Sequence, residues 1–445
     1  MSSFESGRAR ALAAAGVPSP APATAPAFAR AAALALAAVA GLAPAAPVAR
    51  AQSLSLDDAI RIAEGRSARI AAQSAAANAA GELVARAGEL PDPKLVVGIE
   101  NLPVSGADAW RWDQDFMTMR RIGIEQGFPN PGKRRALGAR AEAESRVEGA
   151  NLAASRLQVR RDTANAWFDL RYAEEEHAAL VALAREAELE AQTAAAAVAG
   201  GRLAPADAIA ARAAVEQVRD RLVQYERTLE RARIALARLV GDAAARPLGA
   251  APDTASLPVP RSDLLVRLDE HPAVRTAERQ AALAHADIAV ADSTKTPDWS
   301  LIVSYGQRSP NFSNMVSVLV AIDLPIAAAR RQDRDVAARQ ALAERARSAA
   351  EDARRTAEAE ARTLVADWEA AAARVNRYER AILPLARERV ELALAGYRGG
   401  RGTLAGVLDA RRAEAEARMS LAQALAERAR AWSAITTLLL EEGKS

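Results

Sequence analysis

The 445-residue chain has no cysteine, few aromatic residues and only three histidines. The absence of cysteine excludes disulfides, thiolate metal sites, cysteine nucleophiles and a lipid-modified cysteine. Aromatic residues make up 4% of the chain and charged residues 26%, and alanine is very abundant. This composition favours long, surface-exposed helices over a thick aromatic core.

After residue 51 the chain also lacks any run of 18 apolar residues, so we expect no transmembrane helix there. A segment that enters a membrane would have to do so as strands. Before that point, Arg30 precedes an apolar run over 31–43, and Ala49-Arg50-Ala51 fits a small-x-small cleavage site. We predict that residues 1–51 are a secretory signal peptide, the alternative being a disordered Ala/Pro-rich tail.

Motifs that carry chemistry are missing too. The formal net charge is +3 and no basic stripe is interleaved with aromatics, which argues against nucleic-acid binding. His177, His271 and His285 are scattered, and the same-face pair Met117 and Met119 is more typical of strand packing than of a metal site. No GxSxG, P-loop or paired-histidine motif occurs. We therefore predict no enzyme activity, no cofactor and no metal site.

The sequence changes twice from a strand pattern to a long helical pattern. MTMRRIGIEQGFPNPGKRR alternates apolar and polar residues, is interrupted by Pro129, and then becomes helical. MVSVLVAIDLPIAAARR does the same around Pro325, at an offset of 196 residues. Two earlier strand patterns, KLVVGIENLP and DWSLIVSYG, follow Pro91 and Pro297 at an offset of 206. The chain therefore contains a duplication, with a loop ten residues shorter in its second half.

The duplication predicts two structural repeats joined by a linker. The first repeat covers 52–242, with strands at about 94–103 and 117–128 and a helical hairpin at 133–241. After a linker at 243–260, the second repeat covers 261–445, with strands at about 298–306 and 315–325 and a hairpin at 328–440. Each long helix of about 67 residues would measure roughly 100 Å at 1.5 Å per residue, and Pro384 should kink or split the second one. An N-cap at Ser55 opens a helix that we expect to run towards Leu90.

Each strand pair has one apolar face, which we interpret as lipid-facing. The predicted lipid-facing residues are Leu95, Val97, Ile99, Ile122, Ile124, Trp299, Leu301, Val303, Tyr305, Val316, Val318 and Val320. Strands of about ten residues are long enough to cross hydrocarbon when tilted, but lipid does not tolerate open sheet edges. Four strands cannot close a barrel, whereas three copies would give twelve. Aromatic residues gather in or beside these strands, as interface girdles would require.

At this point the chain resembles a known family. The order helix, strand, strand, long hairpin, repeated twice, with PDPKLVVGIENLP, GIEQGFPNPGKRR, AIDLP and glycine-led hairpin tips, looks like the TolC-type outer-membrane efflux factors. The resemblance covers essentially all of the mature chain. The ENLP strand and the QGFPNPGKRR turn are most similar to the cation-efflux branch that works with heavy-metal pumps.

The resemblance implies a mainly α-helical homotrimer with a twelve-stranded transmembrane β-barrel and an α-helical periplasmic tunnel of coiled-coil character. Its partners would be outer-membrane lipid, a periplasmic adaptor (membrane fusion) protein and an inner-membrane pump of the resistance-nodulation-division (RND) type. Heavy-metal cations would pass by passive conduction from the periplasm to the exterior, and no covalent chemistry is implied.

The resemblance also implies a gate at the hairpin tips, GRLAPADAIAAR and GRGTLAGVLDAR, which match at an offset of 199. The tip residues are Asp207, Asp409, Gly200, Gly201, Arg202, Gly399, Gly400 and Arg401. In the family, acidic residues at the tips form a constricting, cation-attracting ring. From the residues alone, Asp207 is equally well explained as a first-turn helix residue favoured by the macrodipole, and the glycines as helix C-caps.

Three other functions remain open at this stage. A duct for drug efflux or type I protein secretion has the same strands and tips. A periplasmic coiled-coil scaffold without membrane strands predicts a single hairpin and a separate β-rich domain, unlike the two strand-and-hairpin units present here. A hydrolase lacks motif support.

Overall fold

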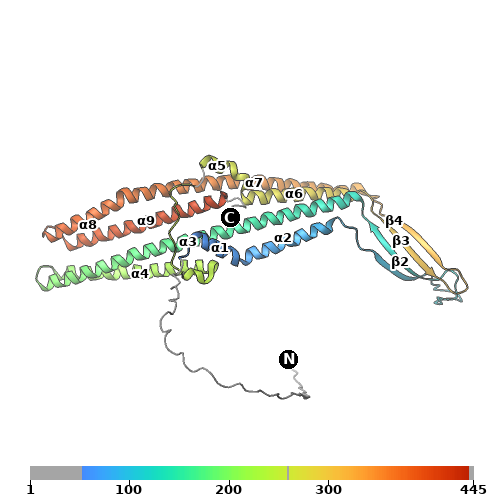
Figure 1. The fold of residues 1–445 in the computed structure, drawn as a ribbon, viewed down its shortest axis with the longest axis horizontal. Helices are drawn as coiled ribbons and strands as arrows, with labels where there is room; N and C mark the ends of the chain where they lie inside the picture. The colour runs from blue at the N-terminus through green and yellow to red at the C-terminus, as the bar shows by residue number, and fades with distance from the viewer. Residues whose placement is uncertain (1–52, 258–259, 440–445) are drawn as a thin grey trace, which may run out of the picture. The chain divides into compact units, whose positions relative to one another are not determined.

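The computed structural model describes residues 53–257 and 260–439. The predicted signal peptide lies outside these residues. The described part of the chain is mainly helical and contains one four-stranded sheet (Figure 1).

The element order repeats in the two halves of the chain. The first half comprises α1 (Leu56–Arg66), α2 (Ala68–Ala87), β1 (Lys94–Glu100), β2 (Met119–Phe128), α3 (Pro131–Ala199) and α4 (Pro205–Val240). A 3₁₀ turn (Gly241–Ala245), α5 (Arg261–Val266) and a second 3₁₀ turn (Arg267–Glu270) connect the halves. The second half comprises α6 (Pro272–Ser293), β3 (Trp299–Gln307), β4 (Met315–Ile322), α7 (Gln332–Arg377), α8 (Leu383–Arg398) and α9 (Leu404–Leu439).

The helix expected from Ser55 towards Leu90 is in fact two helices, so that prediction was wrong. Ser55 caps α1 by accepting a hydrogen bond from the N–H of Asp58, as its sequence context indicated. Ser67 then adopts an extended conformation and its hydroxyl accepts from the N–H of Ile70, which starts α2. A serine that satisfies a free N–H in this way competes with a continuous helix.

The two long helices begin differently. Asn130 caps α3, which continues for 69 residues, about 100 Å at 1.5 Å per residue. In the second half a 3₁₀ turn (Ala328–Arg330) precedes α7, whose cap residue Arg331 makes no side-chain capping bond. One π-helical turn (Tyr378–Ile382) then separates α7 from α8, and Pro384 lies in the first turn of α8. The split falls where the proline lacks the N–H that a continuous helix needs.

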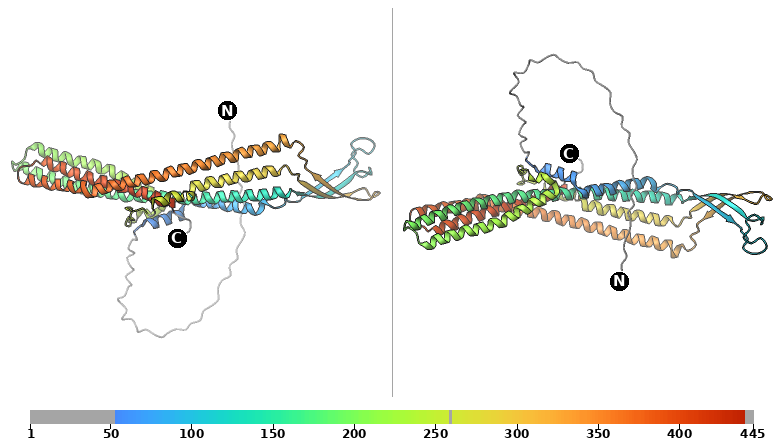
Figure 2. Two further views of the ribbon diagram at one scale, coloured as in Figure 1. Left: turned by 90° about the horizontal axis from the view of Figure 1, so that it is seen from above. Right: turned by 90° about the horizontal axis from the view of Figure 1, so that it is seen from below.

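The helices pack through small side chains around a limited aromatic centre. Trp167 and Phe168 of α3 are fully buried and meet edge to face, with ring centroids 5.3 Å apart. They form a core with α1, α4 and α9, and the Trp167 indole N–H donates to the Leu54 carbonyl at 3.0 Å. Figure 2 shows these helices side by side in two further views. Within the described residues, no helix is both long enough and apolar enough to cross a membrane.

The sheet is antiparallel, with strand order β1-β2-β3-β4. The two hairpins have the same register once the repeat offsets are applied. Leu95 pairs with Ile124 in the first, and their counterparts Leu301 and Val320 pair in the second. The duplication seen in sequence is therefore also a duplication of backbone pairing.

The strand ends differ by a few residues from the sequence-based bounds. β1 ends at Glu100 rather than near residue 103, because Asn101 adopts a left-handed conformation with φ of 57°. Its side-chain amide donates to the Met117 carbonyl and its own carbonyl accepts from the Thr118 hydroxyl, which closes the following loop. β2 begins at Met119 and β4 ends at Ile322, shortly before Pro325.

Candidate functional site

Most of the large apolar residues of the four strands lie on one face of the sheet. Because residues paired across antiparallel strands point to the same side, the register fixes this face. One row across the sheet consists of Leu95, Ile124, Val303 and Val318. The next consists of Val97, Ile122, Tyr305 and Val316. All twelve residues predicted to face lipid lie on this side, and we call it the apolar face.

The apolar face is uncovered in the single chain. Eleven of the twelve residues are exposed, for example Val97 at 68% and Val318 at 65%, while Leu301 is half-buried. The opposite face carries most of the small and polar groups, with a few apolar residues such as Ile302 and Leu319 among them. There Arg121 forms an ion pair with Glu100 and donates to the Ser304 hydroxyl at 2.8 Å. An exposed apolar area of this extent marks a surface that contacts something other than water.

Aromatic side chains occupy both ends of the sheet. At the end near the helices, Phe128 and Trp299 stack with centroids 4.2 Å apart. At the loop end, Phe116 lies 6.4 Å from Phe312, and the guanidinium of Arg120 lies over the ring of Trp112. Aromatic groups at both ends of an apolar band are typical of strands that cross a bilayer.

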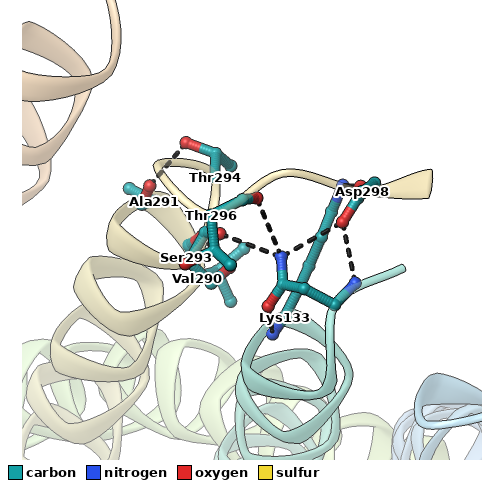
Figure 3. Close-up of polar contacts among 8 residues, drawn as sticks. Lys133, Val290, Ala291, Ser293, Thr294, Thr296 and Asp298 are labelled. Atoms are coloured by element: carbon teal, nitrogen blue, oxygen red, sulfur yellow. Dashed lines mark hydrogen bonds and ion pairs between the residues drawn. The ribbon is translucent and has the colours of Figure 1, made fainter. Parts of the chain in front are cut away.

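The joint between sheet and helices is fixed by Asn130 and Asp298, which come from different repeats. Asp298 accepts from the backbone N–H of Asn130 at 2.8 Å, and its other carboxylate oxygen pairs with Lys133 (Figure 3). The buried Asn130 amide also donates to the carbonyls of Ser293 and Thr296, both at 3.1 Å. Burial by itself would raise the pKa of Asp298, but the bonds from Lys133 and Asn130 outweigh it and hold the pKa below its usual value.

The two hairpin tips have the same backbone geometry. Gly201 and Gly400 have φ of +68° and +70°, a region in which glycine avoids a steric penalty. The next residue in each tip, Arg202 or Arg401, donates its N–H to the carbonyl five residues earlier, at 2.9 Å in both cases. These are Schellman-type ends, so the preceding Gly200 and Gly399 act as helix C-caps, as one of the two sequence interpretations proposed.

The tips pack against each other within one chain. Ala194 and Ala211 of the first hairpin share a small apolar cluster with Leu404 of the second. This brings Asp207 and Asp409 to the same end of the helices. Asp207 is half-buried in the first turn of α4, whereas Asp409 is exposed and lies further into α9.

A buried ionic cluster behind the tips was not predicted from the sequence. The Glu414 side chain is 6% exposed and meets Arg418, Arg411 and Arg387. Arg411 also reaches Glu186 of α3 at 3.4 Å, so the cluster joins the two hairpins. Charges three and four residues apart are frequent along these helices, so no local signal distinguished Glu414 from exposed acidic residues.

Metal ligands do not gather in the described part of the chain. No group of three or more His, Asp or Glu side chains there is placed to hold a metal ion.

Comparison with known proteins agrees with this architecture. Residues 266–439 match the family model described as "Outer membrane efflux protein". The chain is 26% identical over 404 residues to the cobalt-zinc-cadmium resistance protein CzcC of Cupriavidus metallidurans, an alignment that covers 89% of this chain and 93% of the relative.

Solved structures share the fold. The outer membrane protein VceC of Vibrio cholerae matches with a TM-score of 0.71 at 20% identity, covering 86% of this chain and 95% of that one. CusC matches with a TM-score of 0.72 at 17% identity, over 87% and 92% of the two chains. The open MtrE channel of Neisseria gonorrhoeae matches with a TM-score of 0.70 at 21% identity, over 86% and 88%.

The family match, the alignment along most of the chain and the repeated strand-and-hairpin fold all support the resemblance found in the sequence. The alternatives of a periplasmic scaffold and a hydrolase do not agree with them, since family members are ducts rather than enzymes. Residues 266–439 carry the outer membrane efflux protein domain, and the chain is an outer-membrane channel protein that extends into the periplasm.

Proposed function

We propose that three copies of this chain form a channel that conducts heavy-metal cations passively from the periplasm to the exterior. Its partners are a periplasmic adaptor protein and an inner-membrane RND pump, which supplies the energy. The observation that carries the proposal is the apolar face, continuous across four strands whose two outer strands, β1 and β4, each have an unpaired edge in the described chain.

The physical argument for three copies concerns the backbone. Each unpaired N–H or C=O group in hydrocarbon costs several kcal/mol, so an open four-stranded sheet is not stable there. Three sheets joined edge to edge make a closed barrel in which every strand has two neighbours. The polar face with Arg121 and Glu100 then lines the interior, and the apolar face contacts lipid.

The argument for cations concerns the tips and the relative. Asp207 and Asp409 of three copies would form acidic rings at the periplasmic end, and rings of one charge select ions by sign. CzcC is by its name a cobalt-zinc-cadmium resistance protein. A duct for drugs or secreted proteins remains the second candidate, because the sheet and the tip geometry suit either cargo.

Growth of a deletion strain, with and without a plasmid copy, tests the substrate. Silver, copper, zinc, cobalt and cadmium salts are compared with a panel of antibiotics and detergents. We expect sensitivity confined to one or a few cations, restored by the plasmid. Sensitivity to drugs alone would overturn the metal assignment and favour the second candidate.

Conductance in planar bilayers tests the tips. We expect Asp207→Asn with Asp409→Asn to reduce the preference for cations over anions several-fold. Asp113→Asn in the loop between β1 and β2 is the matched control, since it removes an acidic residue from the sheet rather than from the hairpin tips. Equal selectivity in the tip variant and the control would contradict a gate role for these aspartates.

A further inference from the structure

The repeat offsets contain information about a contact that the single chain cannot make. Residues of β1 correspond to residues of β3 at an offset of 206, and residues of β2 to residues of β4 at an offset of 196. These offsets convert the register of the first hairpin into that of the second without any shift. The same correspondence therefore applies to the third pairing in the sheet, between β2 and β3.

The β2–β3 pairing is the contact between repeats, and Glu125 pairs with Ile302 within it. At these offsets Glu125 of β2 corresponds to Ala321 of β4, and Ile302 of β3 corresponds to Val96 of β1. The equivalent pair is therefore Ala321 with Val96. Within one chain these two strands lie at opposite edges of the sheet. The converted contact has to form between two copies of the chain.

From this internal symmetry we infer the register of the subunit interface, and from the basic residue beside the β4–α7 connection we infer an ion pair across it. The edge of β4 in one copy pairs with β1 of the next so that Ala321 lies opposite Val96. In the same interface Asp92 of one copy binds Arg330 of its neighbour. This inference rests on the proposed trimer and adds the residues through which the copies meet.

The strand edges suit this pairing. β1 has seven residues and β4 has eight, and the register pairs Leu95–Glu100 with Ser317–Ile322, most of both strands. It also places Val97 opposite Val320 and Ile99 opposite Val318, which continues the apolar face across the boundary. Such head-to-tail contacts use two different surfaces of each copy and close into a ring when the rotation permits.

The ion pair is inferred by position from the joint between sheet and helices. Asp298, just before β3, binds the start of α3 through Asn130 and Lys133. Its counterpart before β1 is Asp92, which is exposed in the single chain. The counterpart of the α3 start is the β4–α7 connection. Lys133 itself corresponds to Ala329 at the offset of 196, and the adjacent Arg330 is the basic residue nearest to that position.

In the described chain the start of α7 is capped less well than the start of α3. Arg331 caps α7 without a side-chain bond, whereas Asn130 caps α3 with one. Ile326 in the β4–α7 connection is 91% exposed, while its counterpart Asn130 is buried. A neighbouring copy in this register covers the exposed isoleucine and brings an acidic group to the exposed arginine.

Disulfide cross-linking tests the register, and the absence of native cysteine removes background. Val96→Cys with Ala321→Cys should form covalent dimers and trimers when outer membranes are treated with copper phenanthroline. Directly opposite residues in antiparallel strands have Cα atoms about 4.5–5.5 Å apart, within the range of a disulfide. Val97→Cys with Ala321→Cys places the thiols on opposite faces and should stay largely monomeric on a denaturing gel.

A pair within the chain calibrates the reaction. Glu125→Cys with Ile302→Cys is the intrachain equivalent and should oxidise to a faster-migrating monomer. The proposed register is wrong if this pair oxidises while Val96→Cys with Ala321→Cys does not. It is also wrong if Val97→Cys with Ala321→Cys forms covalent dimers equally well. The mass of the unsubstituted protein in detergent tests the trimer separately. If the protein is a trimer but the cysteine pair does not cross-link, only the inferred register is wrong. If the protein is a monomer, the proposed assembly is wrong.

Charge exchange tests the ion pair without oxidation. Asp92→Arg and Arg330→Asp should each lower the temperature at which the trimer dissociates in detergent. The double variant, which restores opposite charges, should regain most of the loss. Additive loss in the double variant would show that the two residues do not meet.

Discussion

Asp298 accepts a backbone hydrogen bond at 2.8 Å from Asn130, a residue 168 positions earlier in the chain. The contact joins the start of α3 to the start of β3 in the other repeat. The Asn130 amide adds bonds to two carbonyls at the end of α6 and its turn. Sheet and helices are thus fixed to each other at the point where the chain changes from one to the other.

Asn130→Ala should destabilise the folded chain because it removes the α3 cap and the side-chain bonds to the Ser293 and Thr296 carbonyls. We expect a loss of about 1–3 kcal/mol, measured as a lower dissociation or melting temperature in detergent. Asn151→Ala in the interior of α3 changes the same residue type away from the joint and serves as the control. Equal losses in the two variants would contradict a special role for Asn130.

Low pH should weaken the same joint. The pKa of Asp298 is lower in the folded protein than in the unfolded chain, so its ionised form favours folding. This contribution is complete above about pH 4, the pKa of an unperturbed aspartate, and is lost as the pH falls through the folded-state pKa. The difference in melting temperature between the unsubstituted protein and Asp298→Asn should therefore shrink below about pH 4. A difference that stays constant would contradict the assignment.

Gly123→Ala should impair the β2–β3 pairing. A Cβ at this position would lie 2.5 Å from the Ser304 Cβ and 2.8 Å from the Val303 carbonyl oxygen. Overpacking of this kind costs about 1–3 kcal/mol. Gly98→Ala is the matched control, since its Cβ would meet nothing within 4 Å. The amount of heat-modifiable trimer in outer membranes measures both, and similar yields would contradict the prediction.

Gly201→Ala and Gly400→Ala should strain the tips, because both glycines have φ near +70°. A side chain in this conformation costs about 1–2 kcal/mol, so we expect the tips to become more sensitive to limited proteolysis. Gly138→Ala on α3 has open space for its Cβ and should have no such effect. Unchanged cleavage at both tips would be evidence against the strain.

A charge on the apolar face should prevent insertion. Val318→Lys should cost about 2–4 kcal/mol near the middle of the bilayer, and we expect less protein in the outer-membrane fraction. Ser317→Lys, one residue away, points to the polar face and should be tolerated better. Equal loss of both would show that the two faces do not differ in environment.

The sequence by itself determined the repeat, the strand positions and the apolar face, because these depend on local periodicity and on matches between segments. A period of two assigns each strand residue to a face wherever the strand pairs, so Val97 and Val318 were identified correctly as members of one face. The glycine-led tips could also be predicted from the sequence, since few residues other than glycine adopt the conformation of Gly201.

Tertiary structure decided what depends on partners far apart in the chain. The break at Ser67 arises from competition between a side-chain cap and a continuous helix, which pattern alone does not resolve. The contacts of Asn130 with Asp298, and of Glu414 with three arginines, bring together residues from separate helices and repeats. Composition and spacing specify which polar side chains are available along each helix. The packing of the hairpins decides which of these side chains contact each other, because a buried polar group is stable only where the packing supplies its partner.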